Sequence, residues 1–361
     1  MKNFLFSTVA AAALMTAVGA ASAAGLSDGG NEASVVQYGN GNVNSQEQTL
    51  IGGWNGNLSV NEQTGDLNKA KTIQVGSKTK AYVDQIGDKN DAAQTQYGYS
   101  DLANTKQVGD RNKSTQTQYG SYNDAQVKQK GDHNTAKQTQ YNVHNDASIK
   151  QKGNYNDATQ SQSGVGNEAG AKQKGHFNTA DQSQTGLYHD ASIKQMGVHN
   201  DAAQTQKGMV NDAYIDQIGF GNGASQNQDG NWNVAKAKQD GFHNDAVQSQ
   251  KGDGNTAKAR QLGMGNDASQ TQKGSYNDAM IEQTGFGNMG KQEQFGLGNE
   301  ATLIQDGGYN MSSQLQAGYK NVSVTTQDGY GNMAKSTQYG DYNLAKTTQV
   351  GSYNMSTITQ K

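Results

Sequence analysis

A glutamine recurs every eleven residues over most of this chain, from Gln63 to Gln360. Glycine stands two positions after each glutamine, except at Asn142, and alanine or another small residue stands seven positions after it. Asparagine stands five positions after it, and the departures are Thr79, Asp101 and His189. Self-similarity at a fixed short period predicts a stacked repeat architecture rather than an ordinary globular fold.

The composition supports this interpretation. Only 32% of the 361 residues are hydrophobic, which is too little apolar mass for a conventional core of this size. Disorder would explain the low hydrophobicity, but a disordered chain needs no strict register. The chain has no proline, which suits strand interiors, and no cysteine, which excludes disulfides and cysteine metal sites.

Each repeat predicts one strand and one turn. Asn123, Ala125, Val127 and Gln129 share one parity, and the residues between them are all polar. Because side chains alternate between the faces of a strand, this pattern predicts a seven-residue strand with an inner and an outer face. The four residues between strands contain the glycine, which permits a positive φ in a tight reversal. The turn glycines singled out are Gly120, Gly131 and Gly153.

Two classes of repeat alternate along the chain. The middle inward residue is glutamine in one class and mostly small or apolar in the other, so the true period is two repeats, or twenty-two positions. We therefore predict an all-β solenoid with two strands and two tight turns per 22-residue rung. Its rungs would stack parallel and in register about 4.7–4.8 Å apart, as in amyloid. The inward side chains predicted to form core ladders are Gln118, Asn123, Ala125, Val127, Gln129, Asn134, Ala136, Gln138, Gln140, Ile149, Gln151, Ile193, Gln195, Ile215 and Gln217.

The chain divides into three predicted segments. Residues 1–23 resemble a secretory signal peptide, with Lys2, an apolar run and a small-x-small motif that ends at Ala23. Cleavage is expected after Ala23 or after Ala24. A short membrane anchor is the alternative, but the run is too short to span a bilayer comfortably. Residues 24–62 hold imperfect repeats, and residues 63–361 form the regular solenoid.

Both ends of the repeat array predict open strand edges, which recruit further chains unless they are capped. The inward residues of the first repeat are Asn31, Ala33, Val35 and Gln37. Those of the last are Asn354, Ser356, Ile358 and Gln360. Docking the first strand of one chain on the last strand of another would continue every ladder.

The outward positions carry no recognisable catalytic site. The histidines lie in turns or at the asparagine position, no two are separated by one full period, and we expect no enzyme, no cofactor and no metal site. The net charge is −3 and no basic run follows a phosphate backbone, so no nucleic-acid partner is expected. Tyr97, Tyr119 and Tyr141 follow one another at the full period, and two interpretations stay open: a stacked ladder or exposed adhesive patches.

The repeat resembles the curlin repeat, as seen where Gln118, Gly120, Asn123, Ala125 and Gln129 recur in phase. Curlins are the subunits of curli, the extracellular amyloid fibres of Gram-negative biofilms. The resemblance implies a secreted, fimbria-like cell-surface fibre that polymerises with itself and serves adhesion, cell aggregation and biofilm matrix. It also implies a minor curlin as nucleator and an outer-membrane channel for secretion. The alternative is a monomeric secreted solenoid that binds a repetitive surface such as ice or polysaccharide, although the outward residues vary too much for a flat regular array.

Overall fold

The protein is described by a computed structural model, which covers residues 8–9, 19–21, 30–51 and 55–361. Every regular element in that part of the chain is a β-strand, as predicted. No helix there is long and apolar enough to cross a membrane. The chain divides into two compact units, Met1–Phe177 and Asn178–Lys361.

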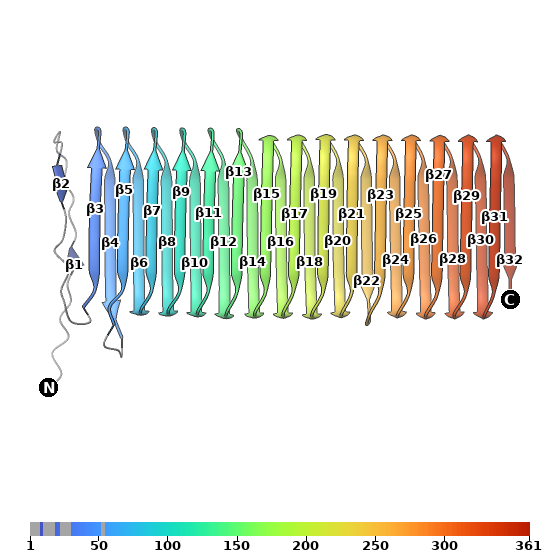
Figure 1. Cartoon of the computed structure of the whole chain (residues 1–361), viewed down its shortest axis with the longest axis horizontal. Coiled ribbons are helices and arrows are strands. Elements are labelled where there is room, and N and C mark those ends of the chain that lie inside the picture. Colours follow the sequence, from blue (N-terminus) through green and yellow to red (C-terminus); the bar gives the residue numbers. More distant parts are fainter. Residues whose placement is uncertain (1–7, 10–18, 22–29, 52–54) are drawn as a thin grey trace. The chain divides into compact units, whose positions relative to one another are not determined.

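The first unit contains two parallel sheets whose strands alternate along the chain (Figure 1). One sheet has the order β3-β5-β7-β9-β11-β13-β15 and the other β4-β6-β8-β10-β12-β14. The strands of this unit are β1 (Thr8–Val9), β2 (Gly19–Ala21), β3 (Glu32–Tyr38), β4 (Val43–Leu50), β5 (Leu58–Thr64), β6 (Lys69–Ser77), β7 (Lys80–Ile86), β8 (Asp91–Tyr99), β9 (Leu102–Val108), β10 (Lys113–Ser121), β11 (Asp124–Lys130), β12 (Thr135–Val143), β13 (Asp146–Lys152), β14 (Asp157–Val165) and β15 (Glu168–His176).

The second unit repeats the same plan. Its even-numbered strands, β16 to β32, form one sheet in numerical order, and its odd-numbered strands, β17 to β31, form the other. The strands are β16 (Thr179–Leu187), β17 (Asp190–Val198), β18 (Asp201–Met209), β19 (Asp212–Phe220), β20 (Gly223–Asn231), β21 (Val234–Phe242), β22 (Asp245–Lys251), β23 (Thr256–Met264), β24 (Asp267–Ser275), β25 (Asp278–Phe286), β26 (Met289–Leu297), β27 (Glu300–Gly308), β28 (Met311–Tyr319), β29 (Val322–Tyr330), β30 (Met333–Asp341), β31 (Leu344–Ser352) and β32 (Met355–Gln360).

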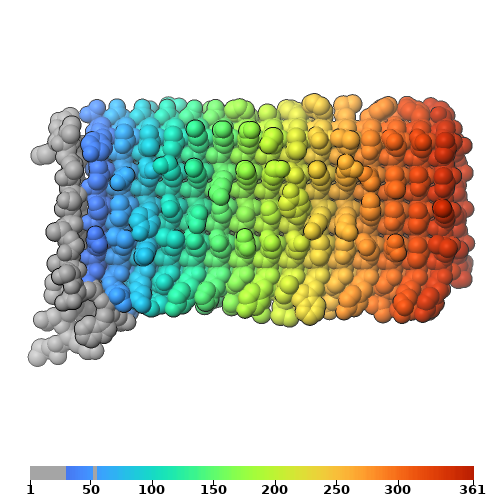
Figure 2. Space-filling view, in the orientation of Figure 1, coloured from blue at the N-terminus to red at the C-terminus, as the bar shows by residue number. Residues whose placement is uncertain are grey.

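Parallel pairing at the predicted full period places like side chains above one another. Gln118 pairs with Gln140 in the first unit, and Ile193 pairs with Ile215 in the second. The space-filling view of the first unit, coloured blue to green, shows side chains of successive rungs aligned in rows (Figure 2). Each unit is therefore the predicted two-strand, in-register β-solenoid.

The core between the sheets is thin and largely polar. Strand β11 alternates buried and more exposed residues from Asp124 to Lys130, so its inner face is the one that the parity predicts. Ala70, Val83 and Ala92 form a buried cluster contributed by both sheets. Most of the other buried side chains are glutamine and asparagine, which must be hydrogen-bonded to be tolerated there.

The turns are shorter in many places than the four residues that the sequence predicts. Strand β10 continues to Ser121, so only Tyr122 and Asn123 separate it from β11, whereas four residues separate β11 from β12. The residue before the turn asparagine adopts a left-handed conformation even where it is not glycine, as at Tyr122 with φ 57°. Its N–H donates to the carbonyl of Tyr99 in the preceding rung at 2.9 Å, so stacking supports this conformation.

The start of the first unit differs from the rest because its pairing is antiparallel. Gly19–Ala21 pairs with β3, and Thr8–Val9 pairs with β4. These two short strands belong to the predicted signal peptide, most of which lies outside the described residues. Gln37 pairs with Gln63, which is four positions more than the usual period. The four additional residues lie in the connection between Leu50 and Leu58, of which residues 52–54 are not described.

Candidate assembly site: the amide ladders and the terminal strands

Buried glutamines form continuous hydrogen-bonded columns within each unit. Nε2 of Gln118 donates to Oε1 of Gln140 at 2.9 Å, and Nε2 of Gln140 donates in the same way to Gln162. In the second unit Gln195 donates to Gln217, also at 2.9 Å. In each of these glutamine-to-glutamine bonds the Nε2 points toward the rung with higher residue numbers. Each rung therefore offers a glutamine N–H that the Oε1 of the next rung can accept.

The second N–H of each glutamine joins the two sheets, and periodicity alone did not reveal this contact. Nε2 of Gln140 on β12 donates to the backbone carbonyl of Asp124 on β11 at 2.8 Å. Gln138 on β12 donates likewise to the carbonyl of Gln126 at 3.0 Å. The glutamine side chain thus bonds along the stack and across the core, which satisfies its amide donors without water.

The asparagine column supports the turns and has the opposite direction. Nδ2 and the backbone N–H of Asn134 both donate to Oδ1 of Asn112 in the preceding rung, at 3.0 and 3.1 Å. Nδ2 also donates to the carbonyl of Gly153 in the following rung at 2.7 Å. Asparagine is suited to this position because one short amide satisfies a turn N–H and a turn carbonyl together.

The turn glycines have a steric role in addition to their positive φ. Gly131 has a φ of 117°, which residues with a side chain rarely adopt. A Cβ added to Gly131 would lie 2.1 Å from the carbonyl oxygen of Gly153. Gly120 and Gly153 have φ values of 137° and 121° and equally close neighbours. Close approach of successive rungs therefore favours glycine at these positions, although Asn142 occupies the place in register with Gly120 at a φ of 79°.

An apolar column fills the centre of the odd-numbered strands. Val127 pairs with Ile149 in the first unit and Ile193 pairs with Ile215 in the second, and all four are buried. All fifteen predicted ladder residues lie at buried positions of the two units. The terminal residues differ, since Asn31, Ala33, Val35, Gln37, Asn354, Ser356, Ile358 and Gln360 are half-buried or exposed.

Thr79 and His189 replace asparagine in the turn column and keep part of its function. Thr79 donates its N–H and its hydroxyl to Oδ1 of Asn57, at 3.1 and 2.7 Å. Nδ1 of His189 accepts the N–H of Asn211 at 3.3 Å. Burial lowers the pKa of His189, which favours the neutral ring that can accept this bond.

Of the three residues that replace asparagine in the turns, Asp101 forms the least complete set of hydrogen bonds. It is 1% exposed, and its Oδ1 accepts the N–H and Nδ2–H of Asn123 at 2.9 and 3.1 Å. Its Oδ2 is buried and has no hydrogen-bond partner among the described residues. At the equivalent place Asn112 donates to the carbonyl of Gly131. Burial raises the pKa of Asp101 to about 6, although the bonds from Asn123 oppose this shift.

An acidic column lines the outer face of the first unit where the odd-numbered strands begin. Asp124, Asp146 and Glu168 are paired in register on β11, β13 and β15. Partial burial, followed by the charges of Asp124 and Glu168, raises the pKa of Asp146 to about 6. Burial also raises the pKa of Asp124. Burial and stacked like charges therefore make the ionised form of Asp146 less favourable than that of a solvent-exposed carboxyl.

Aromatic residues also stack at the surface, and the tyrosine column is a stacked ladder that is partly exposed, whereas an adhesive role for it stays a prediction. The rings of Tyr97 and Tyr119 lie 5.1 Å apart and those of Tyr119 and Tyr141 lie 5.3 Å apart, nearly parallel. The same three residues are 38–43% exposed. They form a ladder whose ring faces contact one another and whose edges contact solvent.

These features define a class of protein: a parallel, in-register β-solenoid whose core consists of amide ladders. The described residues contain no cluster of three or more histidine or acidic side chains that could hold a metal ion. Residues 100–131, 144–175 and 190–219 match the family model of the curlin associated repeat, so the chain contains repeats of this type. A comparison with curated proteins found no match.

Proposed function

We propose that this chain is a structural subunit of an extracellular, curli-type amyloid fibre that assembles head to tail and contributes to biofilm matrix, surface adhesion and cell aggregation. The observation that carries the proposal is the amide ladder, because each rung supplies the donors and acceptors that fix the next. Secretion after removal of residues 1–23, a minor curlin nucleator and an outer-membrane secretion channel belong to the same proposal through the family resemblance.

The growing end in this proposal is the last rung of the second unit. Strand β31 pairs only with β29 and β32 pairs only with β30 among the described residues. Gln360 accepts from Gln338 at 2.9 Å, as other ladder glutamines accept from the rung before them. Its Nε2 donates across the core to the carbonyl of Leu344, which leaves the along-stack position for an incoming glutamine.

The receiving end is the first rung, β3 and β4. If strands continue to alternate, the β3 of an incoming chain stacks on β31 and its β4 stacks on β32. This revises the sequence-based expectation that Asn31–Gln37 docks on Asn354–Gln360. In the described chain Gly19–Ala21 pairs with β3 and Thr8–Val9 pairs with β4, so removal of the predicted signal peptide would free both strands for the parallel pairing.

The direction of the backbone N–H groups gives a sharp test of this junction. The N–H of Met333 donates forward to the carbonyl of Asn354, and the N–H of Asn354 donates back to Asn332. Because successive strand residues direct their N–H groups to opposite neighbours, the N–H of Thr357 faces the open side and that of Ile358 faces β30.

We therefore expect Thr357→Pro to remove a donor needed only by the incoming subunit, whereas Ile358→Pro removes one used inside the chain. Thr357→Pro should keep the folded strand signal in circular dichroism but elongate wild-type seeds slowly, and Ile358→Pro should also disorder the last strand. Seeded elongation followed by thioflavin fluorescence, with electron microscopy of the products, measures both. Elongation of Thr357→Pro at the wild-type rate would refute head-to-tail growth through this edge. A wild-type chain that stays monomeric at high concentration would favour the surface-binding alternative.

A further inference from the structure

The outer face of the first unit carries a regular array of lysines. They occupy two neighbouring outward columns on three consecutive strands of one sheet, β11, β13 and β15. This lysine grid consists of Lys128, Lys130, Lys150, Lys152, Lys172 and Lys174, which pair in register and are all exposed. Rungs repeat about every 4.7–4.8 Å, and the two columns lie two residues, roughly 6.6 Å, apart along the strand.

The lysine grid contains no acidic residue, although Asp132 follows Lys130 by two positions in the turn. None of its six lysines forms an ion pair in the described part of the chain. The acidic column begins four residues before Lys128, roughly 13 Å away along the strand. On the equivalent face of the second unit, Lys194 pairs with Asp216 at 3.3 Å and Arg260 pairs with Glu282. Like charges at one-rung spacing repel, so an external anion would relieve an unfavourable arrangement.

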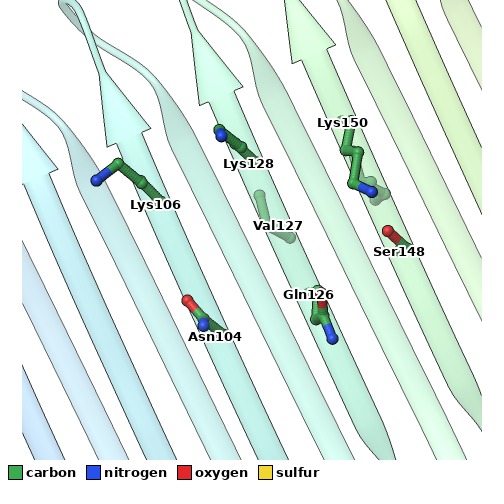
Figure 3. Close-up of a pocket in the computed structure, with 8 residues that line it drawn as sticks. Asn104, Lys106, Gln126, Val127, Lys128, Ser148 and Lys150 are labelled. Atoms are coloured by element: carbon green, nitrogen blue, oxygen red, sulfur yellow. The ribbon is translucent and has the colours of Figure 1, made fainter.

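Grooves run along both columns of the lysine grid. Figure 3 shows Lys106, Lys128 and Lys150 at the same level of three neighbouring strands, beside a hollow of ≈ 170 Å³. A larger groove of ≈ 530 Å³ follows the second column at the turn. Its lysine wall and glycine floor consist of Lys130, Lys152, Lys174, Gly131, Gly153 and Gly175. Because the turn requires glycine, the floor is free of side chains and open to a narrow polymer.

The neighbouring aromatic residues argue against a nucleic acid as the occupant. Single-stranded nucleic acids bind such surfaces by stacking bases on exposed aromatic faces. Here the rings of His133, Tyr155 and Phe177 stack on one another at 4.6 and 5.0 Å, which covers their faces. The lysine grid also contains no arginine, the residue best suited to bidentate phosphate recognition.

We propose that the lysine grid binds a linear acidic polysaccharide, with the chain lying across the rungs along the glycine floor and its carboxylates paired with successive lysines. A polyuronate carries one carboxylate on each sugar, so its charges recur at regular intervals as the lysines do. The site needs one folded unit and does not require fibre formation, so this proposal and head-to-tail assembly can fail independently.

The test uses polygalacturonate and the unassembled mature chain immobilised on a sensor surface. Lys130→Gln, Lys152→Gln and Lys174→Gln are combined in one variant, which should bind roughly ten- to hundredfold more weakly because each lysine near a polyanionic surface contributes to attraction. Binding by the wild type should fall steeply with salt, as charge-driven association does. Circular dichroism of the variant checks that the sheets are retained.

A matched control removes the same charge from the second unit. Lys207→Gln, Lys251→Gln and Lys273→Gln change lysines that also follow a ladder glutamine, but Asp229 interrupts that column and lies 3.9 Å from Lys251. The control should bind within about twofold of the wild type, since these lysines form no uninterrupted row. Equal losses in both variants, absence of polygalacturonate binding by the wild type, or tighter binding of single-stranded or duplex DNA would each overturn the proposal.

Discussion

Asp101→Asn should stabilise the first unit and make its free energy of unfolding less dependent on pH. The pKa of Asp101 is about 6 in the folded chain, against an ordinary value of 3.8, because the carboxylate is buried and its Oδ2 has no partner. The difference of about 2 pH units corresponds to a penalty of about 3 kcal/mol at pH 7. Asparagine removes this penalty, and its Nδ2 can donate to the carbonyl of Gly120 as Asn112 does to Gly131.

The sign of the pH effect follows from the raised pKa. The folded state binds the proton of Asp101 more tightly than the unfolded state, so wild-type stability falls as the pH rises from about 4 to about 6. The penalty is fully present above pH 6 and disappears below the unfolded pKa. The stability gain of Asp101→Asn should therefore be largest at pH 7.5 and nearly vanish at pH 3.5, where the protonated acid can itself donate to Gly120.

Denaturant unfolding of freshly prepared monomer, followed by circular dichroism at pH 7.5, 5.5 and 3.5, measures this difference. Asp110→Asn is the control, because it removes the same charge from an exposed turn position. Its effect should stay within about 0.5 kcal/mol at each pH. If Asp101→Asn and the wild type show the same dependence on pH, burial does not raise the pKa of Asp101.

Three further substitutions test the core and the turns by unfolding measurements. Gly131→Ala should destabilise the chain by about 3 kcal/mol or more, because its φ is 117° and the Cβ would lie 2.1 Å from a backbone oxygen, whereas Gly170→Ala, with open space around the added carbon, should be neutral or slightly stabilising. Gln138→Ala should cost about 2–4 kcal/mol, because it breaks three hydrogen bonds of a buried side chain, and the exposed Gln126→Ala should cost less than about 0.5 kcal/mol. Ile281→Ala should cost about 2–5 kcal/mol through loss of buried apolar contact. Equal effects of Gly131→Ala and Gly170→Ala would contradict the steric role of the turn glycine. Equal effects of Gln138→Ala and Gln126→Ala, or an unchanged midpoint for Ile281→Ala, would contradict the inside–outside assignment.

The repeat predicts the rung because parity and period are properties of the sequence itself. The alternation from Asn123 to Gln129 defines which side chains face inward, and the period of two repeats defines what lies above each of them. The direction of the ladders is different, because an amide carries donors and an acceptor and its sequence position does not say which way it points. The cross-sheet bond from Gln140 to Asp124 depends on how two strands face each other.

The conformations of several turn residues also could not be predicted from residue preferences. Tyr122, His133 and Tyr155 adopt left-handed conformations at positions where other repeats have glycine, as at Gly166. A single turn would disfavour such residues. Stacking gives each one a hydrogen bond to the preceding rung and often a ring neighbour, such as the contact of His133 with Tyr155 at 4.6 Å. The left-handed conformation of these residues is therefore stabilised by the neighbouring rungs, and it cannot be predicted from one repeat alone.

The opposite senses of the glutamine and asparagine columns have an electrical consequence. Aligned amide dipoles add along a column, as peptide dipoles do along a helix, and leave opposite partial charges at its two ends. In this chain Gln118 points its donor toward Gln140, whereas Asn134 points its donor back toward Asn112. Their contributions subtract, so a stack of many rungs accumulates less polarisation than columns of one sense would produce. The partial charges at the two ends of a stack are therefore smaller than columns of one sense would leave.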